Sequence, residues 1–433
     1  MLNGAPDVIV VGGGLAGLAC AGEINRRGGQ VLLLEASDEV GGRVRTDEVD
    51  GFLLDRGFQV LLEAYPECRE SLDYPSLRLQ PFYPGTLVRL DGRFHKIADP
   101  SRELVDAIRS VNAPVGTLSD KLRVSRLRSE LKSISIDDIL YGPTRSTEED
   151  LRAFGFSEQM IDSFFRPFLG GILLDRSLGT PARLFRFYMR MFADGATSVP
   201  ERGMGEIPRQ LASHLPAGSI RTRTPVARIE EGGVILESGE AIEARGVVVA
   251  TEGPEAARLL GDDLADPGSR GTTTLYFDLQ ESPEEDPVLI LNGDGEGPVN
   301  HMAFMDRVSP HYAPKDRGLA AVNVLDDDLP ADLRDEPGRD PARSLLPVVK
   351  AQLVDWFGAQ AEEWRLIRSY RIAHAHPLQT PESFEPPVRP SRIGPGIWVA
   401  GDHRDNASIN GAMASGRRAG IQAMEGIGTA VAR

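Results

Sequence analysis

The first thirty-five residues constrain the fold of this chain most strongly. The apolar run VIVV, Val8 to Val11, is typical of a buried parallel strand, and GGGLAG follows it directly. A helical stretch from Leu15 to about Arg27 and a second apolar run from Val31 to Glu35 complete a strand–turn–helix–strand unit. A unit of this kind with G-x-G-x-x-G in its turn predicts a parallel sheet that binds a dinucleotide.

The glycines of this turn have separate physical roles. Gly12 permits the tight turn, Gly14 lets the backbone approach a pyrophosphate, and Gly17 lets the helix pack close to the strand. The helix begins at Leu15 and Ala16, where free N–H groups and the helix dipole favour a phosphate anion. We therefore count these five residues as cofactor-binding.

An acidic residue and a second pair of glycines extend the predicted site. Glu35 ends the second strand, where its carboxylate can accept hydrogen bonds from both ribose hydroxyls and disfavours the 2′-phosphate of NADP. The segment ASDEVGGRVRT follows, and its Gly41, Gly42 and Arg43 can add backbone donors and a cation to the same pyrophosphate. A surface turn is the alternative, and the position directly after Glu35 favours the cofactor.

The motifs VIVVGGGLAGL and LLLEASDEVGGRVRT resemble the N-terminus of the superfamily of flavin monoamine oxidases, protoporphyrinogen oxidases and phytoene desaturases. Members of that superfamily use FAD, so the resemblance implies FAD rather than NAD. It implies that residues 41–43 lie along the pyrophosphate, and that Gly57 and Phe58 of the D-x-G segment pass near the flavin. It also implies that the backbone of Val226 contacts the adenine end.

The C-terminal segment VAGDHRDNASINGAMASGRRAG is predicted to return to the same cofactor. IWVA, residues 397–400, has the composition of a last buried strand, and Gly401-Asp402 ends it where parallel sheets bind ligands. The resemblance implies that Asp402 lies near the ribityl–phosphate end of FAD. It also implies that Ile409, Asn410 and Ala412 reach the flavin ring.

The helix predicted after this loop contains several glycines. Gly411, Gly416 and Gly420 each weaken a helix by roughly 1 kcal/mol relative to alanine. We expect the residues at 411 and 416 to be small because larger side chains would collide with the cofactor or with the sheet.

The order of elements predicts an α/β protein with two interleaved domains. We expect a Rossmann-like FAD-binding domain of the glutathione-reductase type, formed by residues 1–75, 197–264 and 381–433. An α+β substrate domain is expected at 76–196 and 265–380. The predicted elements behind this division are a hairpin in TLVRLDGRFHKI, helices over 101–192, a meander over 224–254, and strands in TTTLYFDL, VNHMAFM and LAAVNVL.

Two aromatic segments lie in the predicted helical region. They are FFRPFLGG, residues 164–171, and RLFRFYMRMF, residues 183–192, in which Arg183, Arg186 and Arg190 share one helical face. Ordinary core packing is the leading hypothesis for both segments. The wall of an apolar substrate cavity is the next hypothesis, and a peripheral membrane contact is the least favoured because the chain is acidic.

Charge and composition limit the partners. The formal net charge of −16 argues against nucleic acid and against electrostatic docking to anionic lipid. No secretory leader and no membrane span is recognised, and two cysteines, Cys20 and Cys68, make no disulfide framework, so we expect a cytoplasmic protein. The C-terminal segment lacks cysteine, so FAD is expected to be non-covalent.

Histidines are the candidates for a general base. His403 directly follows Asp402. His374 lies in the segment RIAHAHP, and the resemblance implies that this segment runs toward the flavin. A structural role is the leading alternative for both. His374 and His376 at i, i+2 share a strand face, but no third ligand accompanies them, so no metal is expected.

The sequence thus predicts an FAD-dependent oxidoreductase. Many amine-oxidising relatives place a lysine on a strand of the substrate domain, whereas the counterpart here, TTTLYFDL, has none. We therefore expect removal of a hydride equivalent, by desaturation or dehydrogenation, from a largely apolar small molecule, with dioxygen or a quinone as electron acceptor. The alternatives are a flavin amine oxidase acting on an amine and a non-catalytic flavin-binding protein.

Overall fold

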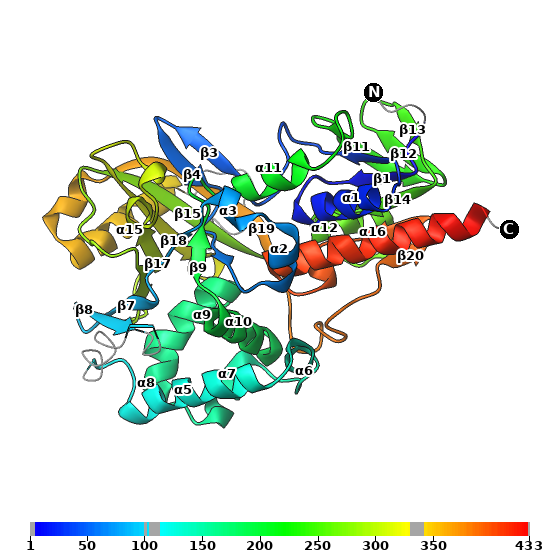
Figure 1. Ribbon diagram of the computed structural model, residues 1–433. Helices are drawn as coiled ribbons and strands as arrows, with labels where there is room; N and C mark the ends of the chain where they lie inside the picture. The colour runs from blue at the N-terminus through cyan, green and yellow to red at the C-terminus, as the bar shows by residue number, and fades with distance from the viewer. Residues whose placement is uncertain (1–4, 99–101, 104–112, 330–341, 432–433) are drawn as a thin grey trace.

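The structure is a computed structural model that describes residues 5–98, 102–103, 113–329 and 342–431 (Figure 1). Two large sheets lie at opposite ends of the molecule, and a group of helices packs below them in the view of Figure 1. The strands of one large sheet all lie within 1–75, 197–264 and 381–433, and those of the other lie within 76–196 and 265–380.

The first sheet has six strands in the order β10-β2-β1-β14-β21-β20, and all neighbours are parallel except β20 and β21. Its central strands are completely buried because both faces are covered, as parallel sheets require. The predicted strands at 8–11, 31–35, 247–250 and 397–400 are confirmed to within one residue. The strands are β1 (Val8–Val11), β2 (Val31–Leu34), β10 (Ile220–Arg221), β14 (Gly246–Val249), β20 (Arg392–Gly394) and β21 (Ile397–Val399).

Two layers cover this sheet. Helices α1 (Leu15–Arg26) and α16 (Ile409–Val431) pack on the face that presents Val8 and Val10. The predicted meander, formed by three antiparallel strands, packs with α12 (Gly253–Leu260) on the face that presents Ile9 and Val11. The meander strands are β11 (Val226–Glu230), β12 (Gly233–Leu236) and β13 (Ala241–Glu243).

The second sheet has seven strands in the order β19-β15-β18-β17-β16-β7-β8, antiparallel except for the pair β16 and β7. Helix α15 (Ala342–Phe357) packs against one face through Leu345, Val349 and Leu353. The predicted hairpin and the three predicted strands of this sheet are confirmed. The strands are β7 (Gly85–Leu90), β8 (Arg93–Ala98), β15 (Ser269–Leu279), β16 (Leu289–Asn292), β17 (Val299–Phe304), β18 (Gly318–Leu325) and β19 (Arg365–Pro377).

The helices below the sheets are tied together by arginines of α10. Arg186 pairs with Asp150 at 2.7 Å, and Arg190 donates to the carbonyl of Ile134 at 2.6 Å. The polar face predicted for this segment therefore joins helices rather than facing solvent. The helices are α5 (Leu118–Ser133), α6 (Ile136–Leu140), α7 (Thr147–Phe154), α8 (Glu158–Met160), a π-helical turn (Ile161–Phe165), α9 (Arg166–Leu173) and α10 (Ala182–Asp194).

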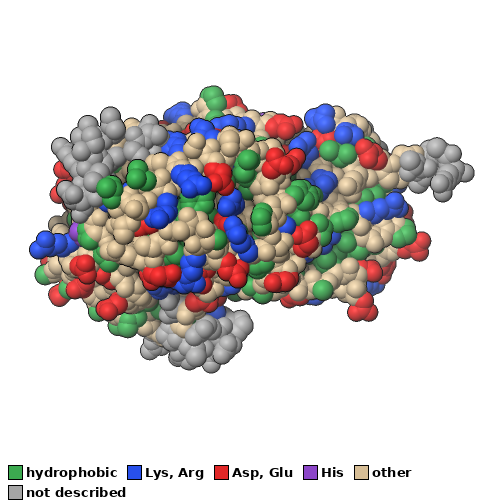
Figure 2. Space-filling model, turned by 90° about the horizontal axis from the view of Figure 1, so that it is seen from below, with side chains coloured by type: hydrophobic (Ala, Val, Ile, Leu, Met, Phe, Trp, Pro, Cys, Tyr) green, Lys and Arg blue, Asp and Glu red, His purple; other side chains and the backbone are tan. Residues whose placement is uncertain are grey.

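Smaller elements connect these parts. The hairpin of β3 and β4 and the three-stranded sheet β5-β9-β6 are separate from the two large sheets. The remaining elements are β3 (Thr46–Val49), β4 (Phe52–Asp55), β5 (Leu61–Leu62), β6 (Gln80–Pro81), β9 (Thr197–Val199), α2 (Pro66–Ser71), α3 (Tyr74–Leu77), α11 (Glu206–Ser213) and α13 (Met305–Val308). Basic and acidic side chains are interspersed on the face seen in Figure 2. No helix among the described residues is long and apolar enough to cross a bilayer.

Helix α16 lies directly on helix α1, which changes the interpretation of its glycines. A Cβ on Gly416 would lie 2.0 Å from the carbonyl oxygen of Ala16, and one on Gly420 would lie 2.8 Å from that of Cys20. A Cβ on Gly411 would meet the carbonyl of Asn406 at 2.0 Å. Backbone of α1 and of the preceding loop, rather than cofactor or sheet, therefore explains why these positions are small.

Gly416 and Gly428 offer a matched test of this packing. Gly416→Ala is expected to lower the free energy of unfolding by about 1–3 kcal/mol, because the new methyl group must push α16 away from α1. Gly428→Ala in the same helix meets no atom within 4 Å and is expected to raise stability by about 0.5–1 kcal/mol through helix propensity. Urea unfolding of both variants measures the difference, and equal effects would contradict the proposed contact.

Candidate functional site

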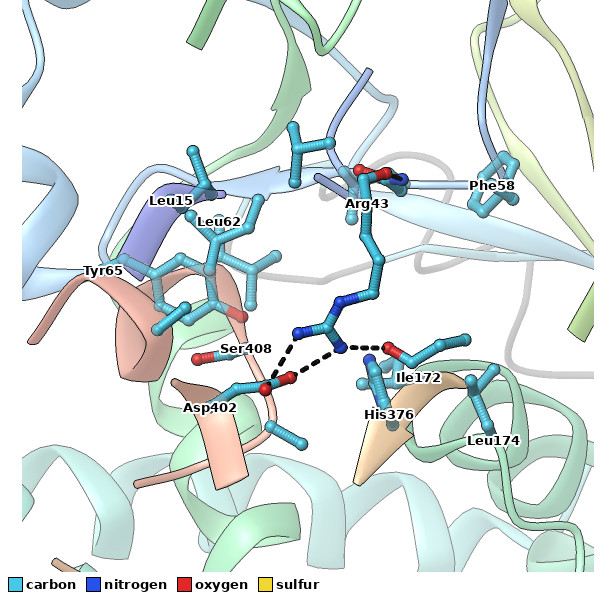
Figure 3. Close-up of a pocket in the computed structure, with 18 of the residues that line it drawn as sticks. Leu15, Arg43, Phe58, Leu62, Tyr65, Ile172, Leu174, His376, Asp402 and Ser408 are labelled. Carbon is cyan, nitrogen blue, oxygen red and sulfur yellow. Dashed lines mark hydrogen bonds and ion pairs between the residues drawn. The ribbon is translucent and has the colours of Figure 1, made fainter. Parts of the chain in front are cut away.

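One cavity of about 1040 Å³ joins the two sheets and the helical region. Its walls come from the glycine turn after β1, the segment after β2, the loop before α16, the inner face of the seven-stranded sheet, and helices α9 and α10. Figure 3 shows part of this wall, in which side chains from distant parts of the chain face one another. The cavity is thus built from both ends of the chain and from its middle.

The glycine turn leaves open space beside one of its glycines, Gly14. Gly12 has φ +104°, and a Cβ on Gly17 would lie 1.9 Å from the carbonyl oxygen of Gly12, so both glycines are required by the protein itself. A Cβ on Gly14 would meet no protein atom within 4 Å, and Gly14 lines the cavity at the N-terminus of α1. This opening beside free helix N–H groups fits the pyrophosphate of a dinucleotide.

Glu35 lies at the edge of the cavity and already accepts three hydrogen bonds. Its Oε2 accepts from the backbone N–H of Gly13 at 2.7 Å, and its Oε1 accepts from the N–H and hydroxyl of Ser37 at 2.8 and 2.7 Å. These bonds fix the carboxylate where β2 ends, and Val226 lines the cavity from the neighbouring meander. Glu35 and Val226 thus line the same cavity.

The second glycine pair lies against the first. The N–H of Gly41 donates to the carbonyl of Gly13 at 2.8 Å, and a Cβ on Gly42 would lie 3.2 Å from the Cα of Gly14. Gly41 and Gly42 have φ values of +124° and +57°, which favour glycine. The two turns therefore form one continuous backbone surface on the cavity.

Arg43 forms a bidentate ion pair with Asp402, as Figure 3 shows. The two N–O distances are 2.8 and 2.9 Å, and Arg43 also donates to the carbonyl of Ala375 at 2.6 Å. Burial opposes ionisation of Asp402, but the guanidinium outweighs it and holds the pKa of Asp402 below its ordinary value. The pair joins residues 359 positions apart at the cavity wall.

The loop before α16 and the first turn of that helix contribute some of the residues expected there. Ile409 and Ala412 line the cavity, as do Gly401 and Asp402. Asn410 is turned away: its Oδ1 accepts from the backbone N–H of Glu67 at 3.0 Å, in the first turn of α2.

The histidines predicted as candidate bases lie outside the main cavity. His403 is 4 % exposed, and burial lowers its pKa to about 4; its ring packs against Gly401. His374 is exposed, and its Nδ1 lies 3.0 Å from the hydroxyl of Ser269. A bulge in β19 between Ile372 and His376 breaks the simple alternation assumed from the sequence.

Two other histidines, His301 and His376, line the cavity instead. Burial lowers the pKa of His301 to about 3 and that of His376 to about 4, so both rings are neutral near pH 7. Sequence reasoning alone does not single out His301, because VNHMAF resembles any buried strand. Strand pairing alone places it on the cavity.

The far end of the cavity is largely apolar, although Arg102 and Arg128 also line the cavity and donate to the backbone carbonyls of Phe192 and Ala193. Phe164, Phe168, Ile172, Met189 and Phe192 line it from the π-helical turn and helices α9 and α10. Other apolar side chains of these helices pack into the hydrophobic core. Each of the two aromatic segments therefore has one face in the core and another face on the cavity. No lysine occurs among the described residues that line the cavity.

The D-x-G segment is anchored by a buried carboxylate. Asp55 accepts hydrogen bonds from the Thr46 hydroxyl, the Tyr312 hydroxyl at 2.7 Å and the N–H of Met204 at 2.9 Å. Burial raises the pKa of Asp55 to about 6, although these hydrogen bonds act in the opposite direction. The anchor positions Gly57 and Phe58, which line the cavity.

This arrangement defines the class of the protein: the chain belongs to the family of flavin containing amine oxidoreductases, whose model matches residues 15–420. The match spans both sheets, the helical region and the loop before α16.

Individual relatives agree with this assignment. The chain is 30 % identical over 382 residues to hydroxyneurosporene desaturase of Cereibacter sphaeroides, covering 80 % of this chain and 70 % of that protein. It is 28 % identical over 169 residues to protoporphyrinogen oxidase 2 of Arabidopsis thaliana, covering 38 % of this chain but spanning only about a third (32 %) of that relative. The structure of cyclohexylamine oxidase from Brevibacterium oxydans shares the fold, with a TM-score of 0.69, 16 % identity, and coverage of 99 % of this chain and all of the other.

The raised pKa of Asp55 predicts a pH dependence of stability. The folded protein retains a proton up to about pH 6 that the unfolded chain releases near pH 4, so this group makes stability fall as the pH rises between those values. Asp55→Asn is expected to remove this fall, which amounts to roughly 3 kcal/mol. Urea unfolding of both proteins at pH 4.5 and 7 measures the part of this fall that lies above pH 4.5, about 2 kcal/mol.

Asp47→Asn in the same hairpin is the control. The hydrogen bonds of Asp47 with Arg56 and Tyr370 outweigh its partial burial and hold its pKa below the ordinary value. Its contribution is therefore lost as the pH falls, which is the opposite sign. A pH dependence that is the same in Asp55→Asn and wild type would contradict the assignment.

Proposed function

We propose that this protein binds FAD non-covalently along the cavity and oxidises a largely apolar small molecule at its far end. The observation that carries this proposal is the continuity of the cavity, which joins the open glycine turn to the aromatic wall. The predicted division into an FAD-binding and a substrate domain is part of the proposal. When bound, FAD supplies the two-electron oxidation, and dioxygen or a quinone is the proposed acceptor.

The proposed cofactor contacts follow the cavity wall. The turn at Gly12, Gly14 and the start of α1 would hold the pyrophosphate, and Glu35 and Val226 would hold the adenosine. Gly57, Phe58, Asp402, Ile409 and Ala412 line the region proposed for the ribityl chain and flavin. Cys20 and Cys68, the two cysteines of the chain, are buried in the core and absent from the lining, which supports non-covalent binding.

The aromatic wall supports an apolar substrate. Side chains of α9 and α10 exclude water from the far end, and dispersion contacts with flat or elongated hydrocarbon would orient the substrate there. Strand β15 carries no lysine toward the cavity, which favours desaturation or dehydrogenation of carbon over amine oxidation.

Gly14→Ala tests the cofactor site. The added methyl group meets no protein atom but occupies the space proposed for the pyrophosphate, so FAD affinity is expected to fall roughly tenfold or more with unfolding unchanged. Gly22→Ala, in the same helix and also without atoms within 4 Å, is expected to leave affinity unchanged. Fluorescence titration of the apoprotein with FAD measures both, and equal affinities would contradict the site.

The reaction is tested under anaerobic conditions. FAD-loaded protein is mixed with apolar polyenes, cyclic ketones or primary amines, and loss of the flavin absorption band reports oxidation of the added compound. Bleaching by apolar compounds but not by amines is expected. Bleaching by amines alone would support an amine oxidase, and no bleaching by any compound would support a non-catalytic flavin-binding protein.

A further inference from the structure

The described part of the sheet wall carries five polar side chains, Thr86, Thr272, His301, Asn323 and His376, and two of them form a cross-strand pair. His301 of β17 and Asn323 of β18 are directly paired across these strands, and both line the cavity while being only 3 % and 2 % exposed. Side chains at directly opposite positions lie on the same face, about 5 Å apart. We call these two residues the donor pair, for the reason given next.

The hydrogen bonds around His301 fix its tautomer. Asn300 donates through Nδ2 to the carbonyl of Pro167 at 2.9 Å, and because a carbonyl only accepts, this end of the amide must be the NH₂ group. The same Nδ2 lies 2.9 Å from Nδ1 of His301, which must therefore accept. The ring proton is thus on Nε2, for which no hydrogen-bond partner is found among the described residues, and His301 lines the cavity.

Asn323 is oriented by Thr274. The Thr274 oxygen accepts from a backbone N–H, so its own proton donates to Oδ1 of Asn323 at 2.9 Å, which leaves Nδ2 as the group without a described partner. The Thr272 hydroxyl also lies 2.9 Å from Oδ1 and shares its single proton with the carbonyl of Val324 at 3.0 Å. The N–H that Thr274 accepts is that of Phe58, at 3.0 Å. The amide is therefore linked to the D-x-G segment that borders the proposed flavin site.

Packing holds the histidine ring in place without a charge. Its edge meets the ring of Phe58 with centroids 4.9 Å apart, and a Cβ on Gly171 of α9 would lie 2.7 Å from Nδ1. Burial lowers the pKa of His301 to about 3, so Nε2–H remains a neutral donor across the physiological range. The donor pair is preorganised and loses little freedom when it binds a ligand.

We propose that the donor pair binds an uncharged oxygen of the substrate, such as a carbonyl or hydroxyl oxygen, and positions an otherwise apolar molecule beside Phe58. This inference rests on the proposed function and narrows its substrate class to apolar molecules that carry an oxygen acceptor. A protonated amine offers only N–H donors and would leave both members of the pair without an acceptor.

Two probes with the same carbon skeleton test the inference. Benzophenone carries a carbonyl oxygen where diphenylmethane has a methylene group, and binding of each to the FAD-loaded protein is followed by the shift of the flavin absorption band. The wild type is expected to bind benzophenone about threefold to tenfold more tightly, as one neutral hydrogen bond allows. His301→Phe is expected to bring the ratio to about one, and His301→Gln, which retains an N–H donor, to restore part of it.

The outcomes separate this inference from the proposed function. FAD binding without discrimination between the probes by the wild type, or an unchanged ratio in His301→Phe, overturns the inference alone; a wild type that binds no FAD overturns both. Tighter binding of protonated benzhydrylamine than of benzophenone also overturns it. If His301→Phe does not fold, Asn323→Asp replaces a donor by an acceptor and is expected to lower the benzophenone preference at least threefold. An unchanged preference in that variant overturns the inference.

Discussion

The parallel pairing of β1 with its two neighbours is the constraint on which the rest of the structure depends. β2 follows after one helix, but β14, the neighbour on the other side, begins at Gly246, and β21 beyond it begins at Ile397. A central strand buried on both faces cannot be left unpaired, because its backbone groups would lose their hydrogen bonds. The long middle segments must therefore leave the sheet and return to it twice.

The cavity is a consequence of this arrangement. Because the inserted segments build a second sheet and a helical layer against the first, the carboxyl ends of β1, β2 and β21 face the inner wall of the other half. The ion pair between Arg43 and Asp402 joins the segments that follow β2 and β21 at that edge. The charges of Arg43 and Asp402 compensate each other, so neither is a buried charge without a partner.

Much of the cavity wall around the glycine turns was predictable from the sequence, because local motifs encode it. The glycines near Gly12 and Gly41 have positive φ values or close backbone neighbours that only their residue type tolerates. The position of His301 was harder to predict, because it depends on which face of β17 is turned toward the cavity, and no local motif encodes that. From the sequence we expect Asn410 at the flavin and Gly416 against the cofactor or the sheet. Asn410 instead contacts α2, and Gly416 contacts α1. A small or polar residue type indicates a close or polar neighbour but does not identify which part of the structure that neighbour is.

The discontinuous sheet also has a consequence for how the chain folds. Until residues near 397–399 are available, β14 has no partner on one side, and the apolar surface of α1 that α16 covers stays open. Contacts between residues so far apart in sequence form slowly, since long loops must close first. During synthesis, the N-terminal half would thus expose a sheet edge and an apolar helix face from the completion of β14 until β21 and α16 have been added, an interval in which chaperones would protect it from aggregation.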